Sequence, residues 1–175
     1  DAVSVNSQGG RYGNALQAAA FRGTELVVQL LLECGAEVNA QGGMFGNALQ
    51  AAANQGNESV VQLFLEHGAE VNAQGGCFGN ALQAAAIQGN GSVVQLLLER
   101  GAEVNAQGGH YGNALQAAAN RGKRIAVQFL LECGAEVNAQ GGDLGNALQA
   151  AAYRGNGSIV QLLLERGAEV NAQGG

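Results

Sequence analysis

A 33-residue period constrains this chain more than any other feature of its sequence. The string GNALQAAA begins at Gly13, Gly46, Gly79, Gly112 and Gly145. Counting unit position 1 from Gly9, the units are 9–41, 42–74, 75–107, 108–140 and 141–173, and residues 1–8 resemble the end of a preceding unit. A period of about 20 to 50 residues predicts a solenoid, in which each unit buries its apolar face only against its neighbours. We therefore expect residues 1–175 to form one elongated domain.

The first half of each unit predicts a short helix with a signal at each end. Asn14 is a good N-cap, and Gln17 three residues later completes an asparagine version of the capping box. Three alanines at 18–20 favour the helix, and Gly23 can adopt the left-handed conformation that ends it. The first helix is therefore expected over about Ala15–Arg22.

The second half of each unit predicts another helix. Thr24, or an asparagine at the same unit position in three other units, offers an N-cap, and Val27, Leu30 and Leu31 form an apolar stripe. Gly35 ends this helix, and the polar residues 36–43 predict an extended turn. Isolated helices shorter than about 12 residues are marginal in water, so the units must stabilise one another by stacking. Neither end of the chain carries a polar capping unit, and we expect the array to continue beyond both ends.

Residues 14–20, NALQAAA, and the later stretch VVQLLLECGAEVNA resemble the ankyrin repeat. The family signature T-P-L-H-x-A-A aligns with the first stretch, with Asn14 in place of Thr, Ala15 of Pro and Gln17 of His. The resemblance implies an all-α solenoid of stacked helix–turn–helix units with hairpin-like turns. The near identity of the units is similar to the ankyrin arrays of fungal NACHT-type, NLR-like (STAND) receptors, and a consensus-designed binding scaffold would look alike.

The composition restricts the possible partners. Eight Lys and Arg against 14 Asp and Glu give a net charge of −6, so the chain has no excess of cations for nucleic acid. No run approaches the roughly 18 apolar residues of a membrane helix. Three cysteines, an odd number, favour a reducing compartment over a disulfide framework. We therefore expect a cytoplasmic protein that binds neither nucleic acid nor membrane.

Differences among the five units separate two kinds of position. Twenty-two of the 33 unit positions hold the same residue in every unit. Among the others, unit positions 19, 22 and 23 exchange only apolar residues, and unit positions 16–18 could be either a tolerant loop or a contact surface. Unit position 4 forms a row that we interpret as packing between neighbouring turns. Its residues are Tyr12, Phe45, Phe78, Tyr111 and Leu144.

Four unit positions change chemistry outright, and they are the candidate protein-binding residues. Unit position 3 holds Arg11, Met44, Cys77, His110 and Asp143. Unit position 13 holds Phe21, Asn54, Ile87, Asn120 and Tyr153. Unit position 14 holds Arg22, Gln55, Gln88, Arg121 and Arg154. Unit position 26 holds Cys34, His67, Arg100, Cys133 and Arg166. The ankyrin resemblance implies that turn tips and the ends of first helices line a concave groove, where we expect unit positions 13 and 14 to form adjacent rows.

The variation favours recognition over simple drift of exposed positions, because Gln29, Glu33 and Gln41 are polar yet identical in every unit. His and Cys residues occur in no metal-ligand spacing, and no nucleophile and base break the repeat pattern. We therefore predict a non-enzymatic, monomeric module without metal or cofactor that binds a protein ligand. A structural spacer or a self-associating scaffold is the alternative, and a recurring exposed apolar patch would favour self-association.

Overall fold

The computed structural model describes residues 4–171, and within that range the chain forms ten helices and no strand. They are α1 (Ala15–Arg22), α2 (Glu25–Glu33), α3 (Ala48–Gln55), α4 (Glu58–Glu66), α5 (Ala81–Gln88), α6 (Gly91–Glu99), α7 (Ala114–Asn120), α8 (Arg124–Glu132), α9 (Ala147–Tyr153) and α10 (Gly157–Glu165). Isolated bridges such as Gly42 to Gly46 close the turns. The predicted all-α solenoid with one helix pair per unit is confirmed.

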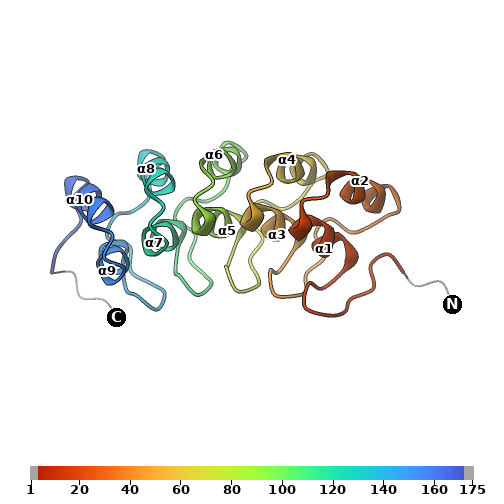
Figure 1. The fold of residues 1–175 in the computed structure, drawn as a ribbon, viewed down its shortest axis with the longest axis horizontal. Helices are drawn as coiled ribbons and strands as arrows, with labels where there is room; N and C mark the ends of the chain where they lie inside the picture. Colours follow the sequence, from red (N-terminus) through yellow and green to blue (C-terminus); the bar gives the residue numbers. More distant parts are fainter. Residues whose placement is uncertain (1–3, 172–175) are drawn as a thin grey trace.

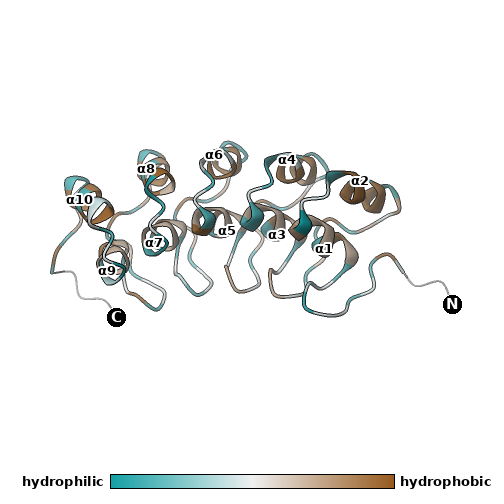
Figure 2. Ribbon diagram, in the orientation of Figure 1, coloured by the Kyte–Doolittle hydropathy of each residue, from teal (hydrophilic) through white to brown (hydrophobic). Residues whose placement is uncertain are grey.

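The ten helices form two parallel rows in an elongated array (Figure 1). The odd-numbered helices, here called the inner helices, lie between the turns and the even-numbered outer helices. Neighbouring inner helices pack more extensively on one another than neighbouring outer helices do. Hydrophobic residues concentrate in the outer helices, and hydrophilic residues in the connections that lead to them from the inner helices (Figure 2).

The inner helices begin as predicted, and α1, α3 and α5 also end as predicted at a left-handed glycine, whereas α7 and α9 end one residue earlier with Arg121 and Arg154 as C-caps. The Asn14 side chain accepts a hydrogen bond of 2.8 Å from the Gln17 amide, and Gln17 Oε1 accepts one of 2.9 Å from the Asn14 amide. This reciprocal pair also forms at α7 and α9, whereas at α3 and α5 only the asparagine accepts. Gly23 follows α1 with a φ of 68°, and in this left-handed conformation its amide donates to the carbonyls of Ala19 and Ala20.

The predicted side-chain caps of the outer helices are wrong. Thr24 and the equivalent residues occupy the N-cap position, but none makes a side-chain cap to the five outer helices of residues 4–171. Asn156 instead donates a hydrogen bond of 3.1 Å to the carbonyl of Ala119, in the inner helix of the preceding unit. Asn57 similarly lies against Gly23, where a larger residue would clash. These side chains therefore join units rather than cap their own helix.

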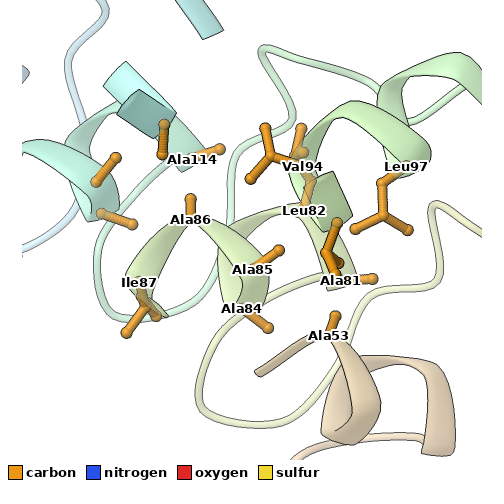
Figure 3. Packing of buried hydrophobic residues seen from close by; sticks show 14 of the residues in the cluster. Ala53, Ala81, Leu82, Ala84, Ala85, Ala86, Ile87, Val94, Leu97 and Ala114 are labelled. Carbon is orange, nitrogen blue, oxygen red and sulfur yellow. The ribbon is translucent and has the colours of Figure 1, made fainter. Parts of the chain in front are cut away.

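Alanine side chains let the inner helices approach closely. Ala84, Ala85 and Ala86 are all fully buried in α5, and Figure 3 shows them between neighbouring units. Small side chains allow the short interaxial distances of about 8–10 Å at which helices pack. Leu82 and Leu97 fill the space between α5 and the outer helix of the same unit. The core is thus a continuous layer that runs the length of the array.

A buried glutamine at unit position 9 connects the inner helices α1, α3, α5 and α7 to the next turn. Gln17 Nε2 donates hydrogen bonds of 3.1 Å to the carbonyls of Ala40 and Gly46. The equivalent bonds to the next turn are made by Gln50, Gln83 and Gln116. The amides of Gln17 and Gln116 therefore satisfy main-chain acceptors of the following turn and a donor of their own helix at once, whereas Oε1 of Gln50 and of Gln83 has no hydrogen-bond partner among the described residues.

An asparagine at unit position 31 forms a second connection. Asn39 Nδ2 donates to the carbonyl of Gly68 at 3.0 Å, and its Oδ1 accepts from the amide of Glu70 at 2.9 Å. Asn6 makes the same two bonds to Gly35 and Glu37, as expected for a residue from the end of a preceding unit. The other members of this ladder are Asn72, Asn105 and Asn138.

The end units lack a neighbour on one side within the described residues. Val27 is 44% exposed and Leu30 is 51% exposed, whereas Val60 at the same unit position as Val27 is fully buried. Leu164 and Tyr153 are exposed at the other end. Burial of the constant apolar residues therefore depends on flanking units.

Replacement of Leu82 by Ala tests this dependence. Leu82 is 2% exposed in a unit that has neighbours on both sides, so we expect its loss to lower the free energy of unfolding by about 2–5 kcal/mol. Leu148, at the same unit position in the last unit, is only half-buried, and Leu148→Ala should cost less. Urea denaturation of both variants makes the comparison. Equal losses would contradict stabilisation by neighbouring units.

Replacement of Gln83 by Ala tests the connection to the next turn. Gln83 is fully buried and donates to the carbonyls of Ala106 and Gly112, so its removal takes away both bonds between the inner helix and the next turn and should cost about 1–3 kcal/mol. Gln149 is exposed, and its hydrogen bonds within residues 4–171 are those with Asn146, which makes Gln149→Ala the matched control with a smaller loss. If thermal melts rank the two variants in the opposite order, the glutamine connection does not stabilise the array.

Candidate functional site

Main-chain hydrogen bonds hold the residues of unit position 3 in a row at the turn tips. The amide of Met44 donates to the carbonyl of Arg11 at 3.0 Å, and the amide of Cys77 donates to the carbonyl of Met44 at 3.0 Å. His110 and Asp143 continue the row with bonds of 3.4 and 3.3 Å. All five side chains except the half-buried Met44 are exposed. Any residue type can make these main-chain bonds, so this position can vary without loss of structure.

Side chains within this row contact one another across units. His110 Nδ1 lies 3.0 Å from Asp143 Oδ2, and both side chains are 64% exposed. Arg11 Nε lies 3.0 Å from Met44 Sδ. Because exposed ion pairs contribute only about 0–1 kcal/mol to stability, the His110–Asp143 pair is better suited to shaping the surface than to holding the turns together.

Unit position 4 packs between neighbouring turns, as predicted. The Phe45 ring lies 6.3 Å from Tyr12 and 5.8 Å from Phe78 between ring centroids. Phe21 joins this cluster at 5.0 Å from both Tyr12 and Phe45. Phe45 is only 3% exposed. This row therefore packs together next to the variable residues of the turn tips.

The expected exposed row at unit position 13 is wrong for the three central units. Asn54, Ile87 and Asn120 are each at most 5% exposed. The inner helices that carry them pack closely against the inner helices of neighbouring units, because the alanines beside them are small. Phe21 is half-buried in the aromatic cluster, and Tyr153 is 71% exposed. Only Tyr153 at this position therefore offers a large surface to a partner.

Unit position 14 forms a row of exposed side chains at the C-terminal ends of the inner helices. The residues Arg22, Gln55, Gln88, Arg121 and Arg154 are all exposed. They directly precede the glycine that ends the inner helix, so their side chains leave the helix where it turns toward the outer row. Three of the five are arginines, residues that are frequent in interface hot spots.

Unit position 26 lies away from the other candidates. Its residues form the C-caps of the outer helices and are all exposed, namely Cys34, His67, Arg100, Cys133 and Arg166. Cys133 lines a hollow between α6 and α8 together with Glu99 and Glu132. The inner helices separate the outer row from the turns (Figure 1). The expectation that this position shares the groove is therefore wrong, since the end of the second helix is on the opposite layer.

Three of the four candidate positions meet in a hollow between units 4 and 5, of about 220 Å³. The turn contributes His110 and Asp143, and the inner helices contribute Asn120, Tyr153 and Arg154. The hollow also borders Tyr111 and Leu144 of unit position 4. The turn tips and the inner-helix ends are therefore parts of one surface, which we call the groove face.

The two layers differ in charge. Within residues 4–171, every carboxylate except that of Asp143 lies on an outer helix or in the segment after it. The outer helices repeat a glutamine–glutamate pair, such as Gln62 Nε2 donating to Glu66 Oε1 at 2.8 Å. The groove face carries four arginines, at unit positions 3 and 14. It is therefore locally cationic although the chain as a whole is anionic.

Stacked helix pairs with a variable, solvent-exposed groove face define a repeat protein of the binding-scaffold class. The family model for ankyrin repeats in three copies matches residues 15–108 and 107–174. The chain therefore belongs to the ankyrin-repeat family, whose members generally act as non-enzymatic protein–protein interaction modules. A comparison with curated proteins finds no match.

Sequence reasoning did not single out the contribution of Lys123 to this surface. It breaks the asparagine pattern of unit position 16. Together with Arg121 and Arg154, it lines another hollow, which is adjacent to the one described above. That break in the pattern was the available signal. Within residues 4–171, no helix is long and apolar enough to cross a membrane, and no group of three potential metal ligands occurs.

Alkylation of Cys77 tests the environment of the turn tips. Partial burial raises the pKa of the Cys77 thiol, and a backbone hydrogen bond opposes this in part. A raised pKa leaves less thiolate at about pH 8, so iodoacetamide should modify Cys77 more slowly than the cysteine of a short unstructured peptide. The difference should shrink at higher pH, where both thiols are ionised. Equal rates at the lower pH, followed by mass spectrometry, would contradict this description.

Proposed function

We propose that this chain is a non-enzymatic recognition module that binds a protein ligand through the groove face. The observation that carries the proposal is the distribution of differences among units. Exposed residues of unit positions 3 and 14 change in charge and chemistry from unit to unit, whereas the equally exposed Gln29 and Glu33 of the outer helices do not change. Exposure alone therefore does not decide which positions differ, although unit position 26 at the ends of the outer helices varies as well.

The near identity of the remaining positions supports a more specific proposal. It is similar to the ankyrin arrays of fungal NLR-like receptors, and we infer that the chain serves as the ligand-sensing region of such a receptor in the cytoplasm. A sensor of this type needs a constant scaffold and a variable face, and the units divide their positions in that way. In this proposal the chain acts as a monomer.

Self-association is the second candidate, and one observation favours it. Leu26, Val27 and Leu30 are exposed at one end of the described array, and Leu164 and Tyr153 at the other. Apart from Leu26, these residues occupy unit positions that are buried or half-buried in the interior units, so end-to-end stacking would cover them. Sedimentation velocity over a range of concentrations distinguishes the two functions, because stacking predicts a growing series of oligomers and the recognition module predicts one species.

A pair of matched variants tests the groove face as the binding surface. The groove variant carries Arg22→Ala, Arg121→Ala, Tyr153→Ala and Arg154→Ala, and the outer-face control carries Glu33→Ala, Glu66→Ala and Glu99→Ala. All seven side chains are exposed, so both variants should fold with nearly unchanged melting temperatures. We expect the groove variant to lose the proteins that the wild-type chain captures from lysate, because hot-spot truncations cost about 2 kcal/mol or more.

The reverse pattern contradicts the proposal. If the groove variant retains the captured proteins and the outer-face control loses them, the binding surface is the acidic outer layer. Retention by both variants excludes the groove face as well. Quantitative mass spectrometry of the captured proteins separates these outcomes.

A further inference from the structure

We propose that the groove face of units 4 and 5 binds an acidic segment of a partner protein, with a carboxylate among Arg121, Lys123 and Arg154 and a neighbouring apolar side chain against Tyr153. This inference rests on the proposed function and names the chemistry of its ligand. It rests on two adjacent hollows, one lined by cationic side chains and the other bordered by aromatic and aliphatic side chains.

The first hollow is cationic. It has a volume of about 280 Å³ and is lined by Asn120, Arg121, Lys123, Arg154 and Asn156. Within residues 4–171 the only ion pair is that of His110 with Asp143, so none of these three cations is neutralised by a carboxylate of the described chain. Lys123 is also the N-cap of α8, whose first turn contains no acidic residue, and the helix dipole adds to the positive potential there.

Contacts with neighbouring residues position Lys123 and Arg154, and none of these contacts is with a carboxylate. Lys123 lies against Gly89 of the preceding unit, where no side chain competes for the space. The Arg154 guanidinium carbon lies 5.7 Å from the centre of the Tyr153 ring, and its Nη2 lies 3.4 Å from Asn120 Oδ1. Arg124 differs, because its Nη1 already donates to the carbonyl of Ser158 at 2.7 Å. Arg121, Lys123 and Arg154 are therefore the groups that remain for a ligand.

The second hollow supplies an apolar contact beside the cations. It shares Asn120 and Arg154 with the first, so the two are adjacent. Tyr153 is 71% exposed at its edge, and Tyr111 and Leu144 lie deeper in the turn row. An extended segment that places a carboxylate in the first hollow would bring the next side chain over these rings. Aromatic and arginine side chains are the residues that dominate interface hot spots.

The charge distribution favours a short acidic peptide over nucleic acid. Unit position 14 is neutral at Gln55 and Gln88, so the cations do not continue as a track along the groove. Nucleic acid binding depends on neutralising several successive phosphates, and the net charge of −6 opposes it. One or two carboxylates match three cations confined to one hollow.

Selection from random dodecapeptides displayed on phage tests the inference on the intact chain. We expect the selected peptides to be enriched in Asp or Glu next to an aromatic or aliphatic residue. A fluorescein-labelled selected peptide should bind Arg154→Glu and Arg121→Glu at least about tenfold more weakly than wild type, as for other desolvated charge pairs. Exchange of the peptide carboxylate for Lys should restore binding to the Glu variants.

Arg100→Glu is the matched control, because Arg100 is an exposed arginine at the C-cap of an outer helix, away from the groove face. Its peptide affinity should equal that of wild type. Selected peptides without acidic residues, equal losses in the Arg100 and Arg154 variants, or no selected peptide at all would overturn the inference. So would a fluorescein-labelled 20-nucleotide single strand that binds as tightly as the peptide.

Failure of this inference is distinguishable from failure of the proposed function. If neutral peptides bind and the alanine groove variant loses them, the groove face is the binding surface but does not require a carboxylate. If peptides bind equally to the groove variant and are lost from the outer-face control, the groove assignment itself is wrong.

Discussion

The side-chain amide at unit position 9 is the interaction on which the rest of the structure depends. Gln83 reaches from the inner helix of one unit to the Gly112 carbonyl in the turn of the next. The Gly112 carbonyl also accepts a bond of 2.8 Å from the amide of Gly108 in its own turn, so the glutamine adds a second bond that comes from the preceding unit. The turn of each unit is therefore held partly by its own main chain and partly by the unit before it. The asparagine ladder at unit position 31 repeats this logic near the ends of the outer helices.

These connections explain why so many positions are identical. A replacement at a connecting asparagine or glutamine disturbs two units, and a larger residue at Ala84 or Ala85 would separate the inner helices. The turn tips are held differently, because the row from Arg11 to Asp143 uses main-chain groups that every residue except proline possesses. Side chains there can change without a change in fold. Specificity for a ligand can therefore vary while the scaffold remains constant.

Local signals predicted the fold well. The period placed every unit, and the capping residues placed α1 at Ala15–Arg22, the range that the structure has. The predictions that were wrong concern contacts between units. Asn156 bonds to Ala119, which is 37 residues away, and Asn57 lies against Gly23 of the preceding unit. Such partners are distant in sequence, so helix periodicity and capping rules carry no information about them.

The candidate site was predicted less completely for the same reason. Unit positions 3 and 14 were assigned to one surface, and the hollow around Arg154 brings members of both together. Unit position 26 was grouped with them because it varies, although its residues lie at the ends of the outer helices. Variation alone identifies positions free to change. Only the arrangement of the layers distinguishes a surface that can bind one ligand from scattered exposed residues.

Hydroxyl-radical footprinting of the chain with and without its captured protein tests the central claim most directly, because it reports side-chain exposure on both layers in one measurement. The account predicts that labelling of His110 and Tyr153 on the groove face falls when the ligand is bound. His67 and Cys133, exposed at the ends of the outer helices, should label equally in both samples. Protection of His67 and Cys133 with unchanged labelling of His110 and Tyr153 would contradict the account.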